Sequence, residues 1–240
     1  MGSIAAQFVA AFLVTSVVAM LGAIHHSASA IAQNTKAVQV SVQTAMPFAL
    51  IAAVIAGGVA MLLISRLMVR GSLADGSPDG AAWAIGSPRQ IRLGLGLGVL
   101  IAIAFVALQT IPALRPTHFT PGPLSKMMMS PGMGRIIWLL SAVLLAPPLE
   151  ELLFRGVLYG GYHRSFGHTK AALIVTLIFC LMHIGEVRRF LLAGVAIGSM
   201  ALGALWMRLR ARAIGPAIAV HLGYNGMLAL LQILSWFGEP

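Results

Sequence analysis

Charged residues are scarce in this chain of 240 residues, and acidic residues are the scarcest. Only 9% of the positions hold Asp, Glu, Lys or Arg, and only six of these are acidic. A soluble domain has about 25% charged residues. The shortage excludes an ordinary soluble protein. The hydrophobic content of 59% and the mean hydropathy of +0.92 indicate a polytopic membrane protein.

Cysteine is also scarce, and positive charge is missing from the N-terminal segment. Cys180 is the only cysteine, which excludes a disulfide framework and a cysteine-based zinc site. The first 24 residues contain no Lys or Arg. They therefore lack the positive region of a signal peptide, and we interpret Ile4–Ile24 as an uncleaved first span.

Positive charge is nevertheless in excess along the rest of the chain, with 16 Lys and Arg and a net charge of +10. In a soluble protein this excess would suggest a nucleic-acid partner. Here the basic residues cluster between apolar runs, where they set orientation and meet anionic lipid headgroups. We therefore expect the lipid bilayer, and no nucleic acid, as a partner.

Seven apolar runs approach the roughly 20 residues that a helical span needs. They are Ile4–Ile24, Met46–Ile64, Leu93–Leu114, Ile136–Tyr162, Ala171–Ile184, Phe190–Met207 and Ile214–Trp236. The fourth run contains Pro147-Pro148, which favour a kink or an unwound turn, and the count becomes eight if this run splits. The fifth run is short for a lipid-facing span, so we expect it to be tilted or enclosed. The predicted fold is an all-α polytopic transmembrane helix bundle.

The gaps between these runs predict an orientation. Alternate gaps hold nine basic residues: Arg66, Arg70, Arg89, Arg92, Arg164, Lys170, Arg208, Arg210 and Arg212. The other gaps hold six: Lys36, Arg115, Lys126, Arg135, Arg188 and Arg189. The bias puts the N-terminus in the cytoplasm. The gap Arg70–Pro88 is rich in Gly, Ser, Pro and Asp and is interpreted as a flexible loop.

Polar residues form three clusters inside the apolar runs. Glu150 and Glu151 are followed by Arg155, and two further clusters contain His183 and then His221 with Asn225. A carboxylate in hydrocarbon is costly, so an ionisable residue inside a span indicates a functional site. Glu151 and Arg155 are four residues apart and can pair on a helix, which leaves Glu150 turned about 100° away. His221 and Asn225 have the same spacing and share a face.

These residue types suit hydrolysis. A carboxylate and an imidazole can hold and deprotonate a water, with or without a metal between them. An imidazole and a carboxamide on one face can stabilise an oxyanion. Each cluster alone has a simpler structural interpretation: a buried ion pair, an interfacial histidine, or hydrogen bonds between helices. Together, one unpaired carboxylate, two histidines and an amide favour a catalytic site.

The ordered motifs E-E-x-x-x-R, F-x-x-x-H and H-x-x-x-N, each in a separate span, resemble one known family. This is the CAAX prenyl protease and bacteriocin-processing (CPBP, or Abi) family of intramembrane endopeptidases. The matching text, Pro147–Asn225, covers about a third of the chain. The resemblance implies a catalytic transmembrane core at 134–240, preceded by transmembrane helices and loops at 1–133. It also implies a multi-pass location in the bacterial inner membrane and a membrane-anchored protein or peptide substrate.

The resemblance also implies a role for each residue. Glu150 would activate the water together with His183, Glu151 with Arg155 would orient the site, and His221 with Asn225 would form the oxyanion hole. Phe179 would pack behind His183. Members of the family have been regarded both as metalloproteases and as glutamate-dependent proteases. Zn²⁺ held by Glu150, His183 and His221 therefore remains an open alternative, although no H-E-x-x-H is present.

Two other functions remain open on the sequence. Glu150, His183 and His221 could form the proton relay of a proton-coupled transporter, although the chain shows no internal repeat. A non-catalytic membrane scaffold or immunity protein could retain the same residues for structure. The favoured expectation is an intramembrane endopeptidase that uses a water activated by Glu and His.

Overall fold

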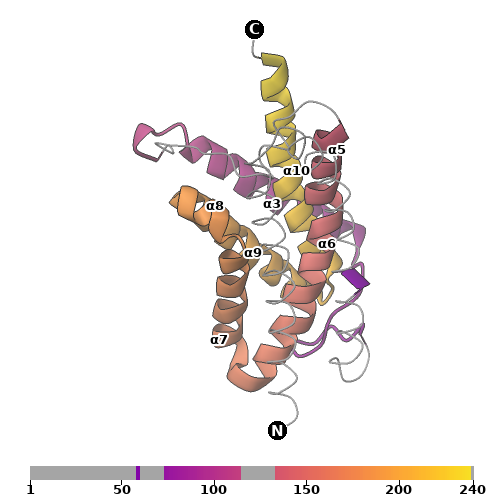
Figure 1. The fold of residues 1–240 in the computed structure, drawn as a ribbon. Helices are drawn as coiled ribbons and strands as arrows, with labels where there is room; N and C mark the ends of the chain where they lie inside the picture. Colours follow the sequence, from indigo (N-terminus) through magenta and orange to yellow (C-terminus); the bar gives the residue numbers. More distant parts are fainter. Residues whose placement is uncertain (1–57, 60–72, 115–132, 239–240) are drawn as a thin grey trace, which may run out of the picture.

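The computed structural model describes residues 58–59, 73–114 and 133–238, and within these ranges every regular element is a helix (Figure 1). The predicted all-α class is confirmed for this part of the chain. Its elements are α3 (Pro88–Leu108), the 3₁₀ turn η1 (Pro112–Leu114), α5 (Met133–Leu140), the π-helical turn η2 (Ser141–Leu145), α6 (Ala146–Glu151), the π-helical turn η3 (Leu152–Leu158), α7 (Tyr159–Met182), α8 (Ile184–Arg189), α9 (Leu191–Ala211) and α10 (Gly215–Gly238).

Four helical stretches in the described residues are long and apolar enough to cross a membrane. They are Pro88–Leu108, Arg135–Met182, Leu191–Ala211 and Gly215–Leu234. The predicted runs Ile4–Ile24 and, apart from Gly58 and Val59, Met46–Ile64 lie outside the described residues. An integral membrane protein is therefore confirmed, and the count of seven or eight spans remains a prediction.

Helix α3 begins five residues before the predicted start of the third run. The Ser87 hydroxyl accepts from the Gln90 backbone N–H, the Gln90 side chain accepts from the Ser87 backbone N–H, and Pro88 occupies the first turn. This capping box satisfies backbone donors that would otherwise lack partners. The helix ends at Leu108, so the predicted end at Leu114 is also wrong.

The stretch from α5 to α7 contains the fourth and fifth predicted runs. Pro147 and Pro148 lie in the first turn of α6, and π-helical turns precede and follow this short helix. A proline lacks the N–H of a regular helix, and here the adjustment is a π-helical turn rather than a break. The reversal occurs at Gly167, where φ is 75° and ψ is 176°, a conformation that only glycine adopts readily.

Figure 1 shows the result as a hairpin whose turn lies at the foot of the picture. One arm descends from α5 through α6 and η3, and the other ascends along the rest of α7. The two arms meet through Phe154 and Phe179, whose rings stand edge to face with centroids 5.0 Å apart. The ascending arm is enclosed on one side only, because Leu173, Leu177 and Leu181 form an exposed stripe along it.

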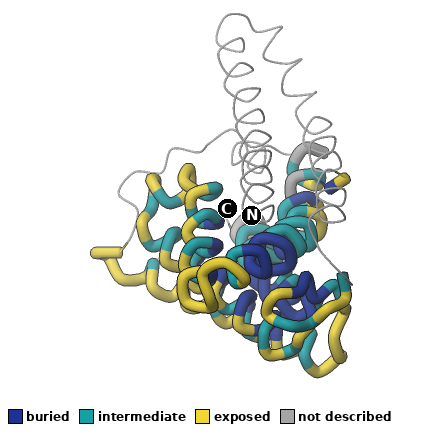
Figure 2. Tube along the Cα trace, turned by 90° about the horizontal axis from the view of Figure 1, so that it is seen from below, coloured by how far each residue is buried: buried dark blue, intermediate teal, exposed yellow. Residues whose placement is uncertain are grey.

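Helices α3, α9 and α10 pack together beside this hairpin, and α10 also contacts η2 and α6. The approach of α3 to α10 is close because of Gly98. A methyl group there would collide with the Val220 carbonyl oxygen and lie 2.7 Å from the Tyr224 backbone nitrogen. Small residues permit such contacts between membrane helices. Buried residues accordingly gather in the middle of the bundle, and exposed residues lie along its outside (Figure 2).

One end of the bundle carries the loop at residues 73–87. Its backbone accepts hydrogen bonds from Ile214 N–H to Ala82 O (2.7 Å) and from Gly215 N–H to Ala84 O (3.0 Å). The predicted loop is present, and Ala81 and Ala82 are buried where the loop is bonded to the α9–α10 corner. Its flexibility remains a prediction. Seven of the nine basic residues in the larger set lie on described segments that meet at this end. They are Arg89, Arg92, Arg164, Lys170, Arg208, Arg210 and Arg212.

Candidate active site

Helix α6 presents two adjacent carboxylates in different surroundings. Glu151 is fully buried, and Arg155 NH1 donates to Glu151 Oε1 at 2.9 Å. Arg155 is itself only 1% exposed. The predicted pair is therefore present, and it lies inside the bundle rather than at the surface. The Glu150 side chain is 26% exposed.

His221 on α10 joins the same carboxylate from the neighbouring helix. Its Nδ1 lies 2.9 Å from Glu151 Oε1, and its Nε2 lies 3.9 Å from Glu150 Oε2. A carboxylate can only accept, so Nδ1 carries the proton and donates it to Glu151. Glu151 thus receives two donors on one oxygen and fixes the orientation of the imidazole, whose other nitrogen faces Glu150.

Several buried polar atoms around this pair lack a hydrogen-bond partner among the described residues. They are Glu150 Oε2, Glu151 Oε2 and Arg155 NH2. Buried polar groups are nearly always paired, often with ordered water. The unpaired atoms therefore identify a place where a polar molecule of the size of water would be stabilised.

His183 lies at the end of the ascending arm of the hairpin. Its Nδ1 is 2.9 Å from the Phe179 carbonyl oxygen, so Nδ1 is protonated and, in the neutral ring, Nε2 is an acceptor. The Phe179 ring contacts three of the predicted site residues. Its centroid lies 4.7 Å from that of His183, 5.8 Å from that of His221 and 4.5 Å from Arg155 Cζ. The two histidines therefore flank one buried aromatic ring.

Asn225 lies one turn after His221 on α10, and its Nδ2 donates to the Ala142 carbonyl oxygen at 2.8 Å. This carbonyl lies in the π-helical turn η2, where a partner five residues later would be expected. That position is Pro147, which has no N–H to donate. The Asn225 amide supplies the missing donor to the Ala142 carbonyl oxygen. His221 and Asn225 therefore both bond to the helix that carries the two carboxylates, as their predicted shared face requires.

The structure brings the six predicted residues together to different degrees. Glu150, Glu151, Arg155 and His221 are direct neighbours, His183 is linked to them through Phe179, and Asn225 is anchored on η2. The pairing of His221 with Glu151 was not expected from the sequence. No sequence signal indicates it, because the two residues are 70 positions apart.

A zinc site does not fit this arrangement of side chains. Among the described residues, no group of three His, Cys, Asp or Glu side chains is placed to hold a metal ion. Glu150, His183 and His221 are therefore not assembled as a ligand set, and no chemical step below uses a metal. Metal analysis of the purified protein by mass spectrometry would test the alternative directly.

Residues 132–227 match the model of the Rce1-like family, described as type II CAAX prenyl endopeptidase Rce1-like. The matched segment covers less than half of the chain and is similar to Rce1-like domains. The Rce1-like segment includes all six predicted site residues, and the match confirms the resemblance to the CPBP family of intramembrane proteases. No curated protein and no solved structure matches the chain.

Proposed function

We propose that the protein is an intramembrane endopeptidase that hydrolyses a peptide bond with a water activated by Glu150. The observation that carries this proposal is the contrast between the two adjacent carboxylates. Glu151 is buried and already paired with Arg155 and His221, whereas Glu150 is partly exposed and keeps an unpaired oxygen beside His221. A carboxylate without a partner inside a membrane bundle is energetically costly, so its presence indicates a functional role.

The first step is attack by water. The Glu150 carboxylate takes a proton from the water while the water oxygen bonds to the scissile carbonyl carbon. His183 Nε2 accepts the second hydrogen of the water and so orients it. This role is consistent with a ring whose Nδ1–H is committed to the Phe179 carbonyl.

The tetrahedral intermediate carries a negative oxygen that needs donors. Asn225 uses one amide hydrogen for Ala142, and its second hydrogen is available. His221 lies on the same face of α10, is held through Nδ1 by Glu151, and donates from Nε2 in its protonated form. When the intermediate collapses, the C–N bond breaks and protonated Glu150 returns its proton to the leaving amine.

We infer that the substrate is a membrane-anchored protein or peptide. Glu150 lies within the stretch Arg135–Met182, which is long and apolar enough to cross a bilayer. A soluble peptide would have to leave water to reach it. A substrate that carries a lipid anchor or an apolar segment is already concentrated in the bilayer and places its scissile bond near this depth.

A comparison of protein termini in the native cell tests the proposal. Wild type, Glu150→Gln and the control Glu186→Gln would be produced at matched levels. Glu186 is an exposed carboxylate on α8, so the control makes the same chemical change outside the site. We expect a reproducible set of new termini on membrane-anchored proteins with wild type and Glu186→Gln, and none with Glu150→Gln.

Identical termini in all three strains would refute the protease. In that case, a cellular phenotype that survives in Glu150→Gln would favour a scaffold function. A pH-driven flux into vesicles that disappears in Glu150→Gln would favour a transporter function.

A further inference from the structure

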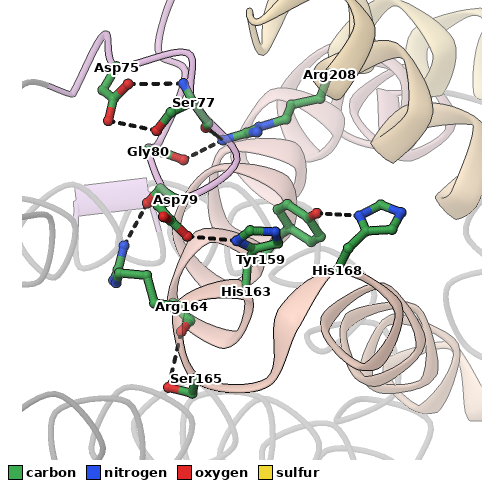
Figure 3. A network of polar contacts seen from close by, with 11 residues as sticks. Asp75, Ser77, Asp79, Gly80, Tyr159, His163, Arg164, Ser165, His168 and Arg208 are labelled. Atoms are coloured by element: carbon green, nitrogen blue, oxygen red, sulfur yellow. Dashed lines mark hydrogen bonds and ion pairs between the residues drawn. The ribbon is translucent and has the colours of Figure 1, made fainter.

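Residues 73–87, here called the strap, cross the end of the bundle and bond to α7, to α9 and to the start of α10. Figure 3 shows the polar contacts on the α7 side. His163 Nδ1 lies 2.6 Å from Asp79 Oδ1, and Arg164 NH1 donates to Asp79 O at 2.6 Å. The strap is therefore hydrogen-bonded to α7 in the turn before Gly167.

The strap also lies directly on the helix that carries the site. Gly156 and Gly160 form a flat face immediately after Arg155. A methyl group at Gly156 would lie 3.1 Å from Trp83 Nε1 and 3.2 Å from the Ala81 carbonyl oxygen. A methyl group at Gly160 would lie 2.7 Å from the Asp79 carbonyl oxygen. Strap backbone thus occupies the space of a side chain at Gly160, and at Gly156 the Trp83 ring and the Ala81 carbonyl oxygen leave a tight contact.

On its other side the strap is bonded to α9 and the start of α10. Arg208 on α9 is fully buried, and its NH2 donates to Ser77 O at 2.9 Å and to Gly80 O. The guanidinium also stands over the Tyr159 ring, 5.5 Å from the centroid, so it links α9 to α7 as well. The bond to Ile214 anchors the strap seven residues before His221.

The bond between Glu151 and His221 joins the same two helices that the strap joins. Glu151 belongs to the α6–η3–α7 arm and His221 to α10, and their atoms are 2.9 Å apart. The strap touches the arm one residue after Arg155 and touches α10 two turns before His221. The strap is therefore connected to both of these helices through short stretches of helix.

We propose that the strap is a positioning element that sets the distance between Glu151 and His221, with Gly156 and Gly160 as its contact residues. The proposal deepens the proposed function, on which its kinetic consequence rests. It assigns a purpose to the contact between the loop backbone and the glycine face.

Three glycine-to-alanine variants test the strap. Gly160→Ala collides with strap backbone, and Gly156→Ala meets a tight contact. Gly96→Ala on α3 is the matched control, because a methyl group there meets nothing within 4 Å. Because each variant makes the same glycine-to-alanine change within a helical segment, the gain in helix propensity is similar in all three. The first readout is the NMR signal of the His221 ring N–H in protein with isotope-labelled histidine. The signal is assigned by its loss in His221→Gln.

We expect the His221 signal to be lost in Gly160→Ala, shifted in Gly156→Ala and unchanged in Gly96→Ala. With a cleaved protein identified from the termini, kcat should fall about 100-fold in Gly160→Ala at unchanged KM, the scale of a misplaced catalytic group. The milder Gly156→Ala keeps the test valid if Gly160→Ala does not fold. An unchanged His221 signal in a folded Gly156→Ala or Gly160→Ala would overturn the proposal. The signal requires no proteolysis, so this result is separate from a failure of the proposed function.

Discussion

Substitution of Glu151 should mainly lower stability, whereas substitution of Glu150 should mainly abolish activity. Glu151→Gln leaves Arg155, which is 1% exposed, without its counter-charge and weakens the bond to His221. Removing one partner of a buried ion pair costs about 3–5 kcal/mol. We therefore expect Glu151→Gln to lower the free energy of unfolding by about 3 kcal/mol, whereas Glu150→Gln, which loses no hydrogen bond, changes it by about 1 kcal/mol or less.

Unfolding in mixed micelles, monitored by circular dichroism, measures both values. Arg155→Met completes a double-mutant cycle with Glu151→Gln. Because the double variant buries no unpaired charge, it should be more stable than the sum of the single changes predicts, by about 2 kcal/mol. Cleavage should be lost in Glu150→Gln although its stability is retained. Equal destabilisation by Glu150→Gln and Glu151→Gln would refute the assignment of a structural and a chemical carboxylate.

Three further predictions concern the rest of the bundle. Gly98→Ala should destabilise the protein relative to Gly96→Ala, because only the first methyl group collides with α10 backbone, and thermal unfolding in detergent compares them. Hydrogen bonds from the serine two positions on hold the pKa of Asp75 below its ordinary value. The stability that Asp75 contributes is therefore present above about pH 4 and is lost as the pH falls through the lowered pKa, and Asp75→Asn should flatten the acid limb of a stability–pH curve. Arg212 closes α9 with φ of 53°. Arg212→Gly should be neutral or stabilising, whereas Arg210→Gly, in the last turn of the helix, should cost up to about 1 kcal/mol. A reversed order in unfolding temperature would contradict this.

The local parts of the site could be predicted from the sequence. The spacing of Glu151 and Arg155 fixes their pairing on any helix, and the spacing of His221 and Asn225 fixes their common face. Both relations survive although π-helical turns flank α6, because each pair lies within one turn. The approximate positions of the described spans also follow from hydropathy alone.

Contacts between distant segments could not be predicted in the same way. The pairing of Glu151 with His221 depends on how α10 packs against α6, and hydropathy carries no information about that geometry. The bonding of the strap to the bundle was missed because its Gly, Ser and Asp residues are typical of a free loop. The start of α3 was missed for a different reason: Arg89 and Arg92 make its first turn polar, so hydropathy begins at Leu93 although the cap at Ser87 was visible.

The hairpin that turns at Gly167 has a consequence for how the protein enters the membrane. Glu151 and Arg155 neutralise each other within one helix, so this arm carries its ion pair into the bilayer without waiting for a partner helix. The Phe154–Phe179 contact can then join the two arms, because the residues involved are close in sequence. Only the arrival of α10 adds His221 and Asn225. A nascent chain therefore holds the Glu151–Arg155 pair and the Phe154–Phe179 contact before α10 supplies His221 and Asn225.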